Sequence, residues 1–343
     1  MTHKERFYAT IERKPVDRPA SWLGLPDKNA VPGLLKHFKV STLDELRVMI
    51  DDDIYPIHFP YHSPTSNEIY TAFDFAKKGD SSPEHWTLNS PGFFENSDNL
   101  DLVDKFPWPD PSKYIDPQEC KRLVKIAPQD MALMGCLWSC HFQDALAAFG
   151  MENAMMQMMV APEMVLAVTN RIIDFYLKAN EIFFEATKGY LDAVLIGNDF
   201  GGQSGLIVSC DDLRKFVLPG ASQLIDQAHS YGVKVIHHSC GSIYDIIPDL
   251  INIGVDAIHP IQAMAKNMDP KRLKENFGNQ VSFVGGVDVQ HLMVHGTPDE
   301  IRSKVEELRE VFPTGLVISP SHEAILPDIP PANIEILFNA IKI

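Results

Sequence analysis

The stretch YGVKVIHHSCGSIYDIIPDLINIGVDAIHP (residues 231–260) contains one pattern twice, a glycine followed at once by a short run rich in β-branched residues. Five such units occur in the second half: Gly189 before LDAVLIG, Gly232 before VKVIHH, Gly254 before VDAIHP, Gly278 shortly before QVSFVGG, and Gly315 before LVISP. A glycine just past a helix end typically takes the left-handed conformation. Apolar strands of this kind are typical of parallel sheets covered on both faces. The pattern predicts repeated helix–strand units, which indicates an α/β fold.

The segments before these glycines have the periodicity of amphipathic helices. Thr297-Pro298-Asp299-Glu300 forms a capping box with proline at the first helical position. Apolar residues then recur at helical spacing in two stretches: Ile301, Val305, Leu308 and Phe312, and, before Gly232, Leu224, Ile225 and Ala228. We expect helices to alternate with the strands.

The first half adds three strand candidates, over 20–24, 53–59 and 131–138. Three and five make eight, the number of strands that closes a (β/α)₈ TIM barrel. We therefore predict one barrel domain over residues 1–343. Residues 60–130 are rich in Pro, Ser, Asn and Asp, and we interpret them as an irregular insertion that folds over one mouth of the barrel. The alternative is a boundary between two domains near residue 125.

The composition is that of an ordinary globular protein, with 45% hydrophobic and 22% charged residues. The 46 acidic residues outnumber the 30 basic ones, so the net charge is −16, which argues against binding to nucleic acid or to a membrane surface. The odd number of cysteines, five, argues against a disulfide framework. The first residues show no apolar secretory signal, and no run approaches the ~18 apolar residues that span a bilayer. We expect a cytoplasmic protein.

Polar side chains follow the ends of the five predicted strands in the second half. They are Asn198 and Asp199, the segment 237–240, His259 and Gln262, Asp288, and the segment 319–323. In a parallel barrel, the carboxyl ends of the strands meet on one rim, and active sites are built there. Any one of these residues could be a helix cap or solvated, but together they predict a site on this rim.

The sharpest motif is His238-Ser239-Cys240. Residues i and i+2 of an extended segment point to the same side, so the imidazole and the sulfur can approach one ion. Zinc is the natural metal for mixed nitrogen and sulfur ligands, and a catalytic zinc needs three protein ligands. His322 is the first candidate for the third ligand, Glu323 the second and Asp199 a more distant one. The alternative is that His238 and Cys240 are buried structural residues.

For two other groups a structural role is favoured. Cys136, Cys140 and His141 also look like ligands, and if their segment is helical the three-residue gap puts both cysteines on one face, but they lie where a strand is predicted to turn into a helix. The methionines at 155, 156, 158 and 159 are interpreted as helical core packing, for which methionine is a pliable filler. A docking surface for a cofactor or partner is the alternative for the methionines.

Several long stretches resemble the uroporphyrinogen decarboxylase superfamily. They are KERFYATIERKPVDRP (4–19), ALAAFGMENAMMQMMVAPEMV (145–165), GNDFGGQSGLIVSCDDLRKF with its continuation through 262, NMDPKRLKENFGNQVSFVGGVDVQ (267–290) and ISPSHEAILPDIPPANIEIL (318–337). The resemblance covers most of the chain apart from roughly residues 25–125. It implies a single barrel with a pocket at the carboxyl-terminal rim.

Within that superfamily, the decarboxylases use no metal and carry an Arg-Gln-Ala-Gly-Arg type motif soon after the first strand. No arginine occurs here between Arg18 and Arg47, and the lysines at 28, 36 and 39 are poor substitutes for guanidinium forks. The cobamide-dependent methyltransferases carry His-x-Cys at the end of a central strand, as at His238 and Cys240, and a third zinc ligand in a Pro-x-Cys segment. Here Ser-Pro-Ser-His places His322 where that cysteine would stand.

The resemblance therefore implies a zinc-dependent enzyme that moves a methyl group between a corrinoid protein and a small thiol or another methyl donor or acceptor. The corrinoid would be carried by a separate partner protein, since no Asp-x-His-x-x-Gly signature occurs here. Asp199 and Asp288 are the candidate catalytic carboxylates. The candidate substrate-binding residues are Gln203, Gln262, His259 and Trp22. Two alternatives stay open, a decarboxylase or other carboxy-lyase and a noncatalytic ligand-binding barrel.

Overall fold

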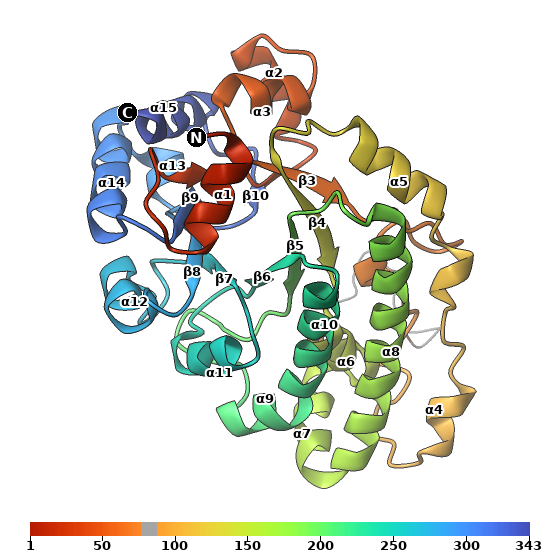
Figure 1. The fold of residues 1–343 in the computed structure, drawn as a ribbon. Coiled ribbons are helices and arrows are strands. Elements are labelled where there is room, and N and C mark those ends of the chain that lie inside the picture. Colours follow the sequence, from red (N-terminus) through yellow and green to blue (C-terminus); the bar gives the residue numbers. More distant parts are fainter. Residues whose placement is uncertain (77–87) are drawn as a thin grey trace.

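The computed structural model describes residues 1–76 and 88–343 of the chain. Eight parallel strands form one sheet in the order β1-β9-β8-β7-β6-β5-β4-β3 (Figure 1). The strands are β1 Ala20–Ser21, β3 Ile54–His58, β4 Ala132–Trp138, β5 Ala193–Gly197, β6 Lys234–His238, β7 Ala257–Ile261, β8 Ser282–Val287 and β9 Leu316–Pro320. The N–H of Asp53 donates to the carbonyl of Ser21 across the two edge strands at 3.3 Å, so the sheet is nearly closed. The predicted (β/α)₈ barrel is confirmed.

Helices surround the barrel (Figure 1). They are α1 His3–Ile11, α2 Val31–Phe38, α3 Leu43–Ile50, α4 Asp101–Lys105, α5 Pro117–Ile126, α6 His141–Phe149, α7 Met151–Val160, α8 Pro162–Thr187, α9 Cys210–Phe216, α10 Leu218–Ser230, α11 Ile247–Asn252, α12 Pro270–Phe277, α13 Leu292–His295, α14 Pro298–Val311 and α15 Pro331–Lys342. The capping box predicted at Thr297 begins α14, and Ile301, Val305 and Leu308 are buried on its inner face. The helix predicted before Gly232 is α10, which buries Leu224, Ile225 and Ala228.

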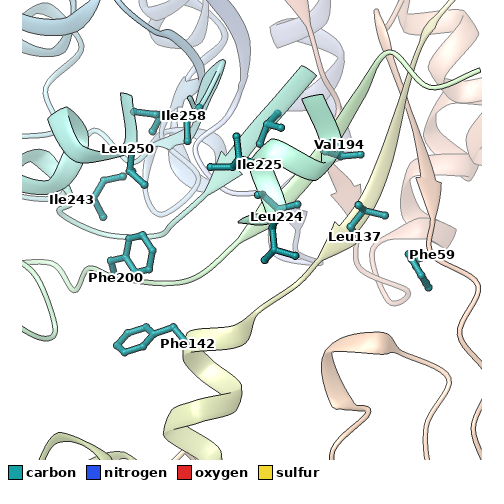
Figure 2. Close-up of a cluster of buried hydrophobic side chains, with 14 of the residues drawn as sticks. Phe59, Leu137, Phe142, Val194, Phe200, Leu224, Ile225, Ile243, Leu250 and Ile258 are labelled. Atoms are coloured by element: carbon teal, nitrogen blue, oxygen red, sulfur yellow. The ribbon is translucent and has the colours of Figure 1, made fainter. Parts of the chain in front are cut away.

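The strands bury both of their faces, and this explains why their sequences are apolar throughout. Side chains such as Met134, Leu195 and Ile236 fill the barrel interior. Their neighbours point outward and pack under the helices, and Figure 2 shows part of this outer layer, including Val194, Leu224 and Ile258. Alternation along a strand fixes which residue faces inward. In β6 this places Ile236 and His238 on the same, inward face, since they are two residues apart.

Four of the five predicted helix-terminating glycines take the left-handed conformation: Gly189, Gly232, Gly254 and Gly315 have φ values of 80°, 76°, 95° and 82°. The prediction is wrong for Gly278, whose φ is −64°. Its N–H still bonds to the carbonyl of Lys274, so the helical turn continues through it. The next two residues then make the turn into β8, which accounts for the extra spacing before that strand.

The excursion between β3 and β4 covers the predicted insertion over 60–130, of which residues 77–87 lie outside the described part. The interpretation of this whole span as irregular is wrong at its end, since Pro117–Ile126 forms the amphipathic helix α5. Before α5, the described residues include the 3₁₀ helices η1 Ile69–Thr71 and η3 Pro111–Lys113 and the short α4.

The excursion packs on the barrel rather than standing apart from it. Lys178 of α8 pairs with Asp110 at 2.7 Å, and Arg171 pairs with Asp104. Aromatic side chains of the excursion, such as Phe75, belong to the same buried cluster as the outer barrel layer. On η1, the ring of Tyr70 lies 6.4 Å from that of Trp138 at the carboxyl end of β4. The excursion therefore reaches the rim on which the site was predicted.

At the opposite end of the barrel, a buried carboxylate ties the amino-terminal elements together. Asp53, which is fully buried, precedes β3 and pairs with Arg6 at 2.6 Å, Arg18 at 2.8 Å and His3 at 2.8 Å. It also accepts the N–H of Ser21 in β1. This explains why the opening segment carries so many charged residues: they fasten α1, β1 and β3.

The methionine run differs from its prediction. Met158 of α7 is buried, but Met156 and Met159 are 47% and 84% exposed, so the interpretation as core packing is wrong for these two. The cause is that one face of α7 has no covering element among residues 1–76 and 88–343.

Every helix within residues 1–76 and 88–343 is too short or too polar to span a membrane.

Candidate functional site

The carboxyl ends of β5, β6, β7 and β9 bring the predicted site residues together. His238 is the last residue of β6 and is buried, with its ring 5.6 Å from Trp138 on one side and 5.0 Å from His259 on another. It is the common member of two groups of donor atoms that could hold a metal ion.

The first group is Asp199, His238 and Cys240. The Nε2 atom of His238 lies 3.3 Å from Oδ1 of Asp199 and 3.4 Å from Sγ of Cys240. The N–H of Cys240 donates to the same Asp199 oxygen at 2.8 Å, which holds the loops after β5 and β6 together. The His-x-Cys spacing predicted two of these donors, and the fold supplies Asp199 as the third.

The second group is His238, His259 and Glu323. The Nδ1 atom of His238 is 2.9 Å from Nδ1 of His259 and 3.5 Å from Oε2 of Glu323. Oε2 of Glu323 and Nε2 of His259 are both buried without a hydrogen-bond partner among the described residues. Both ring nitrogens of His238 are thus surrounded by donor atoms.

His322 completes the cluster from the loop after β9. Its ring stands at 88° to that of His238, with the centroids 6.2 Å apart. Its Nδ1 accepts the N–H of Ala324 at 3.0 Å and lies 3.3 Å from Oε2 of Glu323. His322 lies beside His238 and Cys240, as predicted, but it is 38% exposed and belongs to neither group of close donors.

The charges in the cluster favour an anionic sulfur and carboxylate beside imidazoles. Burial would raise the pKa of Cys240, but hydrogen bonds from His238 and His322 lower it below the ordinary value of a thiol. Burial also opposes ionisation of Asp199, but its bond with His238 lowers the pKa to about 2. Thiolate and carboxylate are the forms that bind metals.

The histidines of the cluster differ from one another. Burial would lower the pKa of His238, but Glu323 and Asp199 raise it well above the usual value. The bond with Cys240 raises the pKa of His322. Burial lowers the pKa of His259 far below the usual value, so this imidazole is neutral. Glu323 and Asp199 thus favour the protonated form of His238 beside a neutral His259, and zinc would have to displace that proton, because a metal-bound imidazole is neutral.

The structure places the remaining predicted residues at various distances from the cluster. Trp22 is buried under it, with its ring 5.2 Å from that of His259 and its Nε1 unpaired among the described residues. Gln262 accepts the N–H of Gly241 through Oε1 at 2.8 Å and so holds the loop that carries Cys240. Gln203 is exposed, and its carbonyl accepts the N–H of Lys266. Gln203 therefore has no described contact with the cluster.

Asp288 has a different environment from Asp199. Its side-chain oxygens accept the backbone N–H groups of Gln290, His291 and Leu292 at 3.0, 2.9 and 2.9 Å. These bonds occupy the carboxylate at the start of α13. The geometry supports a capping role for Asp288, and no described contact joins it to His238.

Trp138 is a neighbour of the site that was not predicted from the sequence. Its ring packs edge-on against His238, and the signal was available, because Trp138 ends a strand as His238 does. His141, by contrast, has the structural role expected for its group: its Nε2 lies 3.0 Å from the carbonyl of Val217. Cys136 lies in β4 and Cys140 precedes α6, so the expectation of a shared helix face is wrong.

The described residues form several cavities. One of about 290 Å³ is lined by Gln262 and His322, beside the cluster. Two others, of about 510 and 780 Å³, are lined by residues of the excursion. None of the residues that line the two larger cavities belongs to the His238 cluster, so size alone does not mark the site.

The donor set fits zinc. Zinc binds nitrogen at about 2.0–2.1 Å and sulfur at about 2.3 Å, so neighbouring ligands in a tetrahedron stand about 3.3–3.6 Å apart. The 3.3 and 3.4 Å separations from His238 Nε2 to Asp199 and Cys240 match these edges. Oε2 of Glu323 and Nε2 of His259 have no hydrogen-bond partner among the described residues, so a bound cation or its water ligands could interact with them.

The fold is a parallel eight-stranded barrel, and imidazole, thiol and carboxyl groups gather at its carboxyl-terminal rim. These two features define the class, a (β/α)₈-barrel protein with a candidate metal centre. Residues 114–343, about two thirds of the chain, match the family model described as "Uroporphyrinogen decarboxylase (URO-D)". The chain belongs to this family.

The relatives that the chain matches include a decarboxylase and a methyltransferase, the two activities that the resemblance raises. It is 29% identical over 144 residues to "Uroporphyrinogen decarboxylase" of Chlorobium phaeobacteroides, covering 39% of this chain and 38% of the relative. It is 26% identical over 158 residues to "Methylated-thiol--coenzyme M methyltransferase" of Methanosarcina mazei, covering 46% and 40%. The chain thus spans about two fifths of the length of these relatives.

A solved structure shows the same fold along the whole chain. It is described as a "methyltransferase from Methanosarcina mazei" and is similar with a TM-score of 0.71 at 18% identity, over 100% of this chain and 98% of the other. At this identity the likeness concerns the fold.

Proposed function

We propose that this protein is a zinc-dependent methyltransferase that moves a methyl group between a corrinoid, carried by a separate protein, and a small thiol. The observation that carries the proposal is the placement of Asp199 and Cys240 at tetrahedral spacing from His238 Nε2. The similarity to a methylated-thiol methyltransferase supports the choice of chemistry.

His238, Cys240 and Asp199 would hold the zinc ion, and His322 would stand beside the position left for substrate. Bound zinc would lower the pKa of a coordinated thiol, so that it stays an anionic nucleophile near neutral pH. In the proposed transfer the thiolate would attack the methyl carbon, so that a sulfur–carbon bond forms while the cobalt–carbon bond breaks and leaves its electron pair on cobalt. The 290 Å³ cavity lined by His322 has a size suited to a small thiol.

The surrounding residues orient the ligands. His259 is neutral and sits 2.9 Å from Nδ1 of His238, which fixes the ring so that Nε2 faces Asp199 and Cys240. Such contacts behind a ligand typically change metal affinity by about 10–100-fold. Gln262 holds the Gly241 N–H and so restrains the loop that carries the sulfur. Trp138 covers the ring of His238 and keeps water from one side of it.

The sequence and structure together disfavour uroporphyrinogen as the substrate. A tetrapyrrole with many carboxylates needs free guanidinium groups to bind it. Arg47 is buried, pairs with Asp52 at 2.6 Å and donates to the carbonyl of Gly24, while Arg18 pairs with Asp51 and Asp53. Both arginines that flank the first strand are therefore occupied by protein partners.

The test combines metal analysis with an assay of methyl transfer. The wild-type protein, purified with zinc in the medium, is expected to hold about one zinc per chain, and Cys240→Ser less than a tenth of that. Cys210→Ser is the matched control, because Cys210 lies on α9 and does not belong to either donor group. Transfer from methylcobalamin to a small thiol is followed by the change in corrinoid absorbance.

Two results contradict the proposal. The first is a zinc content that is unchanged in Cys240→Ser. The second is turnover of uroporphyrinogen by metal-free protein, which would establish the decarboxylase instead. Folding of each variant is checked by circular dichroism, so that loss of zinc is not confused with loss of structure.

A further inference from the structure

The 510 Å³ cavity on the excursion side has an acidic and aromatic lining that the proposed function does not use. The aromatic side chains of this lining are Tyr70, Phe73 and Phe75, and the carboxyl groups are those of Asp74 and Asp144. The ring of Phe75 is stacked on Phe73 and on Phe106, so it contributes apolar surface rather than a free face. Among the described residues that line it there is no lysine, arginine or histidine. When its carboxyl groups are ionised, such a cavity attracts cations, and a free aromatic face such as that of Tyr70 adds to the attraction.

Asp144 is the buried member of this lining. It lies on α6, directly after the rim end of β4, and it is 7% exposed. The hydroxyl of Tyr176 donates to its Oδ2 at 2.5 Å, and this is its one side-chain donor among the described residues. No cation pairs with it there. A carboxyl group buried without a positive partner is costly to ionise, and such groups are typical of ligand sites.

We propose that this cavity binds an organic ammonium ion, with the positive centre between the Asp144 carboxylate and the aromatic rings. Cations bind to the faces of aromatic rings, and quaternary ammonium ligands are characteristically held by aromatic cages. A compact ammonium with alkyl groups satisfies both parts of the lining, because its charge pairs with the acid and its methyl groups contact the rings. This inference does not depend on the proposed methyl transfer.

Asp144 and the titratable groups around it determine how the binding of a cation depends on pH. Burial raises the pKa of Asp144 to about 8. Burial also keeps the pKa of Tyr176 and of Cys140 well above their usual values, and Tyr70 shifts in the same direction, so these groups stay neutral. Asp74 lies on the exposed side of the cavity. Binding of a cation therefore releases a proton from Asp144 below about pH 8, and affinity is expected to rise with pH up to that point.

Two aromatic side chains connect the cavity with the metal cluster. Tyr70 lines the cavity and its ring lies 6.4 Å from that of Trp138, which in turn lies 5.6 Å from the ring of His238. A bound ammonium ion would consequently be separated from His238 by Tyr70 and Trp138.

The experiment compares two probes of the same shape, choline and the uncharged 3,3-dimethylbutan-1-ol, by titration calorimetry on the full chain. At pH 8.5 we expect choline to bind at least tenfold more tightly than the alcohol. From pH 6 to pH 8 its affinity should increase by about tenfold per pH unit, with proton release seen in buffers of different ionisation enthalpy.

Variants distinguish the cavity from nonspecific binding. Asp144→Asn keeps the shape of the side chain and should remove both the preference for choline and the pH dependence. Tyr70→Leu, at a 42% exposed position that the fold tolerates, should weaken choline about fivefold through the lost ring contact. Asp226→Asn, an exposed acid on α10, is the control and should bind choline as the wild type does. Equal affinity for the two probes, no binding of choline, or an unchanged preference in Asp144→Asn would overturn the proposal.

Discussion

The Nε2 atom of His238 lies 3.3 Å from Oδ1 of Asp199, although the two residues come from different strands of the barrel. The contact exists because β5 and β6 are parallel neighbours with Gly197 paired to His238, so their carboxyl ends stop at the same level. Gly197 leaves room for this approach, since a Cβ there would stand 2.6 Å from the Cβ of His238. The relationship places a carboxylate where two zinc-ligand candidates already meet.

Replacing this carboxylate should weaken zinc binding. In Asp199→Asn the neutral amide is a poorer ligand, and we expect the affinity for zinc to fall by at least about tenfold, measured by competition with a chelator. Asp288→Asn is the matched control. It should keep the wild-type zinc affinity and lose about 1 kcal/mol of stability, because Asp288 accepts three backbone N–H groups at the start of α13. Equal losses of zinc in both variants would contradict the assignment.

The buried carboxylate of Asp53 should be a major source of stability. Asp53→Asn leaves the guanidinium groups of Arg6 and Arg18 buried without their common counter-charge, and removal of one partner from such pairs typically costs about 3–5 kcal/mol. Urea unfolding followed by circular dichroism measures the loss. Zinc content per folded chain should not change, since Asp53 lies at the opposite end of the barrel. A loss below 1 kcal/mol would mean that the pairs contribute little.

The carboxyl group of Asp53 also predicts how the free energy of unfolding responds to acid. Burial disfavours the charged form of Asp53, but His3 and Arg18 outweigh it and lower its pKa below the ordinary value. A carboxyl group whose pKa is lowered by folding stabilises the protein above its unfolded pKa of about 4. That contribution is lost as the pH falls through the lower folded pKa. Wild-type unfolding free energy should therefore drop steeply below pH 4, and Asp53→Asn should show a smaller drop.

The pH dependence that Asp144 gives to stability should be opposite to that of Asp53. Folding raises its pKa to about 8, so its contribution is present below the unfolded pKa of about 4 and is lost as the pH rises toward 8. In Asp144→Asn the side chain is neutral at every pH and its oxygen can still accept from Tyr176. Between pH 5 and pH 8 the variant should gain about 3 kcal/mol relative to the wild type, from urea unfolding at the two pH values. Parallel pH profiles would contradict the burial of an uncompensated acid.

Gly24 should be intolerant of a side chain. Its φ is 84°, and a Cβ there would lie 2.3 Å from the carbonyl oxygen of Glu323. That carbonyl accepts the N–H of Leu25 at 2.6 Å, where β2 (Leu25–Pro26) pairs with β10 (Ala324–Ile325). Gly24→Ala must push away the segment that carries His322 and Glu323. We expect a loss of at least about 2 kcal/mol in unfolding free energy.

A second glycine variant, Gly189→Ala, separates the effect of backbone strain from the effect of displacing the segment that carries His322 and Glu323. Gly189→Ala is also at a positive φ, 80°, but no atom lies within 4 Å of the added Cβ. It should be destabilised by about 1 kcal/mol through backbone strain and keep its zinc. Gly24→Ala should in addition bind zinc more weakly. Identical zinc affinities for the two variants would show that the Gly24 contact does not position the loop after β9.

Much of the architecture followed from local patterns. Helix-ending glycines at 232 and 254 and the apolar runs after them predicted strands, because a residue's conformational preference and a strand's burial are visible in a few neighbouring positions. Where the pattern was weak, the prediction failed. Helix α5 was missed inside a Pro- and Ser-rich stretch, and Met156 and Met159 were assigned to the core although only tertiary packing decides which face of α7 is covered.

The sequence alone predicted the eight-stranded barrel, from helix–strand units that repeat along the chain, and the closeness of His238 and Cys240, from their spacing within one segment. Only the tertiary structure decided which carboxylate joins them. From the sequence, His322 was the first candidate for a further ligand, Glu323 the second and Asp199 a more distant one. The structure instead places Asp199 beside Nε2 and Glu323 beside Nδ1 of His238. Distances across a barrel depend on how strands are staggered and on which loops touch, and no local pattern in a single chain encodes them.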